Sequence, residues 1–139
     1  MTPELAGRIQ TRLFLFSTIG VVVMLPFALA FGFDLYAGLF YIMVLGFGWD
    51  CIYHRLTLFR WERDWPTSVQ FISGIWEGLF FYLLTTVVDI PPFNGAARAG
   101  AFWIAYPVTF LAIFLASQGP LRVVFPHWRW NGGRVFERW

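Results

Sequence analysis

The chain has 139 residues, of which 58% are hydrophobic and only 13% are charged, and its mean hydropathy is +0.62. Soluble domains carry about 25% charged residues, and a soluble domain of this length has too little interior to hide so much apolar surface. The composition therefore excludes an ordinary soluble domain and predicts a single-domain, all-α membrane protein. The net charge of +2 gives no support to nucleic-acid binding, and we expect no nucleic-acid partner.

Four long stretches with few charges predict four transmembrane helices, because crossing a hydrocarbon core about 30 Å thick takes about 20 mostly apolar residues. We place these helices at residues 13–33, 35–56, 67–88 and 99–118. Short connections make neighbouring helices antiparallel, so we expect two antiparallel hairpins. Residues 1–12 and 119–139 are then predicted to be tails outside the membrane.

The first stretch also has features of a secretory signal peptide, with a basic start and an Ala28-Leu29-Ala30 triplet that resembles a cleavage site. Its uncharged run is longer than the apolar core of about 7–15 residues typical of signal peptides. We therefore interpret it as a membrane helix, and we expect Pro26 to kink it.

The arginines are distributed asymmetrically about the four predicted helices. All ten basic residues are arginine, and only Arg98 falls on the opposite side from the other nine. Cytoplasmic loops carry the excess of positive charge in membrane proteins. We therefore expect both termini and the loop between the second and third helices to be cytoplasmic, in a bacterial inner membrane.

Arginine and tryptophan alternate on this predicted cytoplasmic side. Tryptophan favours the headgroup layer, and both residue types are common at the centres of protein interfaces. We therefore expect a surface that contacts either anionic lipid or a partner protein, formed by Arg60, Trp61, Arg63, Trp65, Arg122, Trp128, Arg129, Trp130, Arg134 and Arg138. Asn131-Gly132 lies between two aromatic-basic runs and predicts a short β-hairpin or turn.

Asp50 and Glu77 are the acids inside the predicted spans, and they are the candidate functional residues. Charged groups in membrane helices usually face the bundle interior or a wet cavity. With a rise of 1.5 Å per residue, Asp50 lies about 9 Å and Glu77 about 15 Å from the cytoplasmic ends of their helices, so we expect them at similar depth. Each acid lies in a stripe of polar or small residues, which are Gly46, Asp50 and His54 on one helix and Gln70, Ser73, Gly74 and Glu77 on the next.

These stripes have two interpretations. In the first, Asp50, His54 and Glu77 relay protons, bind a cation or hold a polar substrate. In the second they are structural: Asp50 pairs with His54 or Arg55, Glu77 bonds Ser73 or a tryptophan N–H, and Gly74 and Gly78 form a small-residue patch for close helix packing. Cys51 is the only cysteine, and we predict no metal site.

Small size and short loops favour a non-catalytic accessory, structural or assembly subunit with heteromeric membrane partners. One alternative is a small oligomeric proton-coupled transporter or channel that uses Asp50 and Glu77. A second is a membrane enzyme acting on lipid or isoprenoid, although no nucleophile motif is present. We predict no cofactor and expect bound lipid, while the 22% aromatic content leaves pigment or quinone binding open.

Overall fold

A computed structural model describes residues 4–61, 66–88, 90 and 96–136, with the side chains of 96–99 left out. The first helix is continuous and consists of α1 (Leu5–Leu15), the π-helical segment η1 (Phe16–Gly20) and α2 (Val21–Phe31). It is followed by α3 (Asp34–Phe59), α4 (Thr67–Val87) and α5 (Ala96–Gln118). The chain ends with the short helix α6 (Pro120–Val124) and the 3₁₀ turn η2 (Pro126–Arg129).

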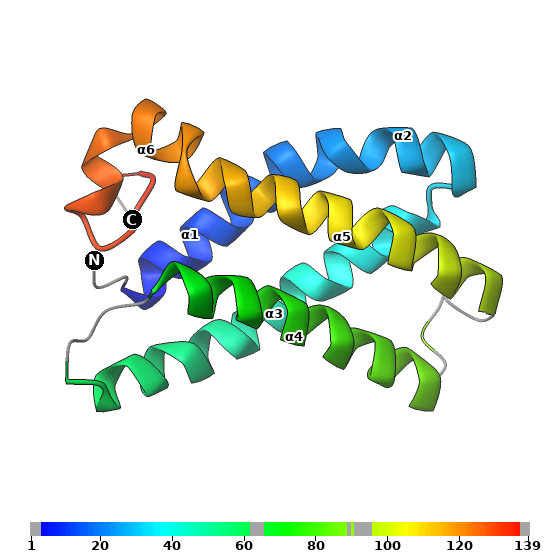
Figure 1. Cartoon of the computed structure of the whole chain (residues 1–139), viewed down its shortest axis with the longest axis horizontal. Coiled ribbons are helices and arrows are strands. Elements are labelled where there is room, and N and C mark those ends of the chain that lie inside the picture. Colours follow the sequence, from blue (N-terminus) through cyan, green and yellow to red (C-terminus); the bar gives the residue numbers. More distant parts are fainter. Residues whose placement is uncertain (1–3, 62–65, 89, 91–95, 137–139) are drawn as a thin grey trace.

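The long helices run in alternating directions along the molecule (Figure 1). The start of α1, the end of α3, the start of α4 and the helix α6 all lie at one end of the bundle, which we call the arginine end (Figure 1). α2 and η1 pack against α5, while α1 and α2 also pack against α3. The first helix is therefore the centre of the packing, with contacts to both α3 and α5.

Three helices of the described chain are long and apolar enough to cross a membrane: Leu5–Phe31, Asp34–Phe59 and Gly100–Val124. Their boundaries follow the hydrophobic pattern closely except at the N-terminus. The first helix begins at Leu5 and not at residue 13, so most of the predicted N-terminal tail is helical. Burial and pairing of Arg12 explain the difference, because a neutralised arginine no longer ends a membrane helix.

Local residue chemistry accounts for the irregular points of the first helix. Pro26 removes one backbone donor inside α2, and the π-helical turn at Phe16–Gly20 lies about two to three turns before it. Gly32 ends the helix with φ 114°, a backbone conformation that residues with a Cβ rarely adopt. The reversal into α3 follows directly at Phe33.

Two apolar clusters fill the interior. The larger joins α2, α3, α4 and α5 and contains Met24, Leu35, Leu39, Ile42, Phe81, Phe102, Ala105 and Tyr106. The smaller lies at the arginine end and contains Leu15, Ile113, Ala116, Leu121, Trp128 and Val135. The second cluster shows that the C-terminal segment is part of the folded core.

The C-terminal segment folds back onto the start of α1. The Glu4 N–H donates to the Gly132 carbonyl over 2.8 Å, and the Thr11 hydroxyl donates to the Gly133 carbonyl over 2.8 Å. The same hydroxyl accepts a 2.8 Å bond from Trp128 Nε1. Within the described part of this segment there is a turn but no β-strand, so the turn alternative holds and the β-hairpin does not.

Replacing Thr11 by valine is expected to loosen this attachment. Valine has the same shape but leaves the buried Trp128 N–H and the Gly133 carbonyl without their partner, which costs about 1–3 kcal/mol of unfolding free energy. The effect is measured by the rate of tryptic cleavage within 129–134 in detergent. Thr86→Val is the control, since the exposed Thr86 hydroxyl bonds only the Leu83 carbonyl of its own helix; equal cleavage of the two variants would contradict the role of Thr11.

Candidate functional site

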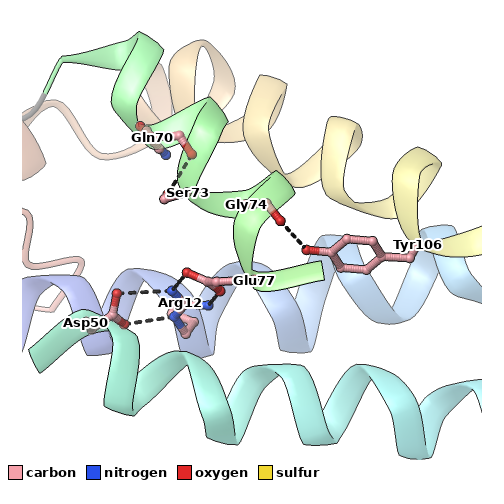
Figure 2. Close-up of polar contacts among 7 residues, drawn as sticks. All are labelled: Arg12, Asp50, Gln70, Ser73, Gly74, Glu77 and Tyr106. Atoms are coloured by element: carbon pink, nitrogen blue, oxygen red, sulfur yellow. Dashed lines mark hydrogen bonds and ion pairs between the residues drawn. The ribbon is translucent and has the colours of Figure 1, made fainter. Parts of the chain in front are cut away.

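Arg12 from α1, Asp50 from α3 and Glu77 from α4 meet in a buried triad (Figure 2). Arg12 Nε and Nη2 donate to the two Asp50 oxygens over 2.8 and 3.0 Å. Nη1 and Nη2 donate to the two Glu77 oxygens over 2.8 and 3.0 Å. One guanidinium therefore holds both carboxylates in two-pronged contacts, and the two acids lie at the same level, as the sequence predicted.

The triad is well shielded. The side chains of Arg12, Asp50 and Glu77 are 13%, 5% and 6% exposed. Four hydrogen bonds satisfy all four carboxylate oxygens and use four of the five guanidinium N–H groups. Charges buried in this way are tolerated only when they are paired and hydrogen-bonded, so the three residues form an ionic cross-link between three helices.

Gly46 provides the space for Arg12. It lies one turn before Asp50 on the same face of α3, and a Cβ built at Gly46 would overlap Arg12 Nη1 and Cζ and lie 2.8 Å from Nε. Gly46 and Asp50 therefore form the site on α3 that the Arg12 guanidinium occupies. His54, the third member of the stripe, forms no side-chain hydrogen bond with Asp50 in the described chain, since both Asp50 oxygens bond Arg12.

Beside the triad lies a cavity of about 190 Å³. It separates α1 from α4, whose Cα atoms nowhere come within 8 Å of each other. Its polar wall includes Arg8, Arg12, Glu77 and Arg122, and its apolar wall includes Phe16 and Ile113. The Arg12–Glu77 ion pair is thus the direct link between two helices that are otherwise held apart.

The polar face of α4 bonds to α5 near the arginine end. Gln70 Nε2 donates to Ser117 Oγ over 3.1 Å, and Gln118 Nε2 donates to Gln70 Oε1 over 2.9 Å. Arg122 Nη2 donates to Gln118 Oε1 over 2.6 Å. Ser73 bonds only the Gln70 carbonyl of its own helix, at 2.8 Å (Figure 2). Gln70 is therefore engaged in helix pairing, while Ser73 lines the cavity.

Gly74 and Gly78 admit aromatic rings from α5. A Cβ at Gly74 would overlap the Phe110 ring, and one at Gly78 would overlap the Tyr106 ring. The Tyr106 hydroxyl donates to the Gly74 carbonyl over 2.8 Å (Figure 2). The predicted small-residue patch therefore admits aromatic rings of α5 into space that larger side chains would fill.

The predicted arginine–tryptophan surface is only partly at the surface. Arg60, Trp61, Arg129 and Trp130 are exposed, Trp61 fully so. Trp128 is buried instead, because its indole N–H bonds Thr11, and Arg122 stacks on its ring with Cζ 5.9 Å from the ring centroid.

Arg134 forms an ion pair with Glu4 at 2.5 Å. Arg63, Trp65 and Arg138 lie outside the described residues. The described part of the chain brings together no group of three or more His, Cys, Asp or Glu side chains that could hold a metal ion.

Sequence reasoning missed Arg12 as a site residue, because it was counted among the flanking charges of the first helix. The signal that could have found it is the charge distribution of the predicted spans, which hold two acids well inside and no arginine except Arg55, next to the end of its span. The glycine one turn before Asp50 is a second signal, since it leaves room for a large partner. Comparisons with protein-family models, with curated proteins and with solved structures found no match to this chain.

Proposed function

We propose that this protein is a non-catalytic accessory, structural or assembly subunit of a larger membrane complex. The observation that supports the proposal is the hydrogen bonding of the two intramembrane acids. Every oxygen of Asp50 and Glu77 accepts a hydrogen bond from Arg12. These oxygens are committed to a link between three helices, which favours a structural role over the binding of a cation or a polar substrate.

We propose four crossings of the bilayer, with α4 as the fourth span. α4 has 21 residues, which at 1.5 Å per residue extend about 31 Å. It is anchored by ring packing with α5 and by the Arg12–Glu77 ion pair, so its lower hydropathy is compensated inside the bundle. The excess of arginine at the arginine end favours placing that end and both termini in the cytoplasm. We propose a bacterial inner membrane as the location of the protein.

The partners we propose are anionic lipid headgroups and a heteromeric membrane protein. Support comes from the aromatic side chains exposed next to arginines at the arginine end. Phe59 and Trp61 flank Arg60, and Trp130 follows Arg129. The exposed fractions of Phe59, Trp61 and Trp130 are 87%, 100% and 87%. Aromatic and arginine side chains supply much of the binding energy of protein interfaces.

The cavity beside the triad favours a second candidate, a proton-coupled transporter that uses Asp50 and Glu77. The two candidate functions predict different proton transport by the purified protein without partner chains. Purified protein in liposomes loaded with a pH-sensitive dye is expected to show no proton flux above that of empty liposomes. A flux abolished by Asp50→Asn/Glu77→Gln would overturn the accessory role.

The assembly itself is tested in native membranes. We expect extraction into lipid nanodiscs followed by native mass measurement to show the chain bound to a chain of different mass. The triple variant Arg12→Met/Asp50→Leu/Glu77→Met removes all three charges of the triad and is expected to assemble equally. Recovery of the chain only as a monomer or homo-oligomer would contradict the proposal.

A further inference from the structure

We propose that the cavity between α1 and α4 binds the phosphate group of an anionic phospholipid. The proposal is independent of the accessory role, because it concerns what fills this cavity and not what the complex does. It rests on the charge of the lining, on the size of the space and on its position in the bundle.

The charged lining is suited to an anion. Arg8, Arg12 and Arg122 contribute three guanidinium groups, against the carboxylates of Asp50 and Glu77. Three guanidinium groups against two carboxylates leave the lining with an excess of one positive charge. Arg122 Nε is buried and has no hydrogen-bond partner among the described residues. Arginine binds phosphate oxygens through paired N–H groups, and Arg8 lies one turn before Arg12 on the same face of α1.

Three of the hydroxyl groups in the lining already form hydrogen bonds within the protein. Thr11 bonds Gly133 and Trp128, Tyr106 bonds Gly74, and Ser73 bonds its own helix. They offer little to a neutral polar substrate such as a sugar. The guanidinium groups are donors only, so they favour a ligand that accepts hydrogen bonds, as a phosphate does.

The volume of the cavity suits a lipid headgroup and not a whole lipid. A space of about 190 Å³ is of the same order as a cavity of about 150 Å³ that binds benzene. A phosphate with part of its glycerol fits into such a space, whereas two acyl chains do not. The apolar wall formed by Phe16, Phe110 and Ile113 suits the first methylene groups, and the rest of each chain stays in the bilayer.

The position agrees with a lipid source. Arg122 belongs to α6 and Arg8 to the first two turns of α1, so both lie at the arginine end, where exposed tryptophans mark the headgroup layer. A lipid phosphate reaches this level without leaving the membrane, and each surface arginine adds about 1 kcal/mol of attraction to anionic lipid.

The test is a melting titration of the full-length protein, delipidated in a neutral detergent. Phosphatidylglycerol is expected to raise the melting temperature, whereas phosphatidylcholine and millimolar inorganic phosphate leave it nearly unchanged. Arg8→Gln/Arg122→Gln is expected to weaken the apparent affinity for phosphatidylglycerol at least tenfold. Arg129→Gln, an exposed arginine in the same C-terminal segment, is the matched control and should change the affinity less than twofold.

A second variant keeps every charge in place. Ser73→Leu adds apolar volume to the cavity wall and is expected to abolish protection by phosphatidylglycerol while the protein melts cooperatively without lipid. Equal protection by inorganic phosphate would overturn the lipid as the source of the anion. Equal losses in the double variant and in Arg129→Gln, or protection retained in Ser73→Leu, would overturn the site itself.

Discussion

Replacing Arg12 by methionine is expected to lower the unfolding free energy by about 3–5 kcal/mol, because it removes the cation that pairs with two buried carboxylates. Asp50 and Glu77 are 5% and 6% exposed, and Arg12 provides the hydrogen bonds to all of their oxygens. The loss is measured by unfolding in mixed detergent–dodecyl sulfate micelles, followed by tryptophan fluorescence. Arg55→Met is the matched control, since Arg55 is exposed on α3 and surface changes usually stay within about 0.5 kcal/mol.

The triple variant Arg12→Met/Asp50→Leu/Glu77→Met separates charge from shape. Buried ion pairs replaced by apolar residues of similar volume are often neutral or stabilising. The triple variant is therefore expected to recover most of the stability that the single variant loses. Equal instability of the two would show that methionine fails for steric reasons, and a stable Arg12→Met protein would contradict the triad as the link between α1 and α4.

The hydrophobic pattern predicted most of the fold because lipid imposes it. A helix forms all of its backbone hydrogen bonds within one segment, as a span in hydrocarbon requires. Uncharged stretches of about 20 residues therefore predict helices. The observed α3, α4 and α5 begin and end within about three residues of the predicted spans. The start at Leu5 was missed because the pattern treats Arg8 and Arg12 as charges that end a span.

The C-terminal segment was the least predictable part. Asn131-Gly132 is typical of a hairpin turn, and the turn is present, with φ 60° at Gly132 and 82° at Gly133. The flanking residues pack on α1, and the bonds between them, such as that from the Gly133 N–H to the Trp128 carbonyl over 3.0 Å, belong to a turn and not to a β-ladder. Contacts such as Thr11 with Trp128 join positions far apart in the chain, and no local pattern encodes them.

The sequence identified the two acids of the triad but not their arginine partner. Asp50 and Glu77 stand out because acids are rare in apolar helices, and helical spacing correctly placed them at one level. Their partner was hidden, since an arginine near a helix end is usually a headgroup anchor. Deciding between an anchor and a buried partner requires the packing of three helices, which spacing along one helix does not supply.

Gly46→Ala is expected to displace Arg12 and to destabilise the protein by about 1–3 kcal/mol, the usual cost of overpacking. The new Cβ would occupy space now filled by Arg12 Nη1 and Cζ. Arg12 is held by four hydrogen bonds, so it cannot move aside without breaking some of them. Gly48→Ala is the matched control, since no atom lies within 4 Å of a Cβ there, and alanine gains up to about 1 kcal/mol of helix propensity over glycine.

The same change is expected to have a different effect on stability in the triple variant. With methionine at position 12 and apolar residues at 50 and 77, no hydrogen-bonded guanidinium opposes the new methyl group, and a flexible methionine adapts to it. Gly46→Ala should then cost little or be stabilising, so the two changes couple by at least about 1 kcal/mol in a double-mutant cycle. Additive effects in both backgrounds would show that Gly46 serves backbone packing and not the seating of Arg12.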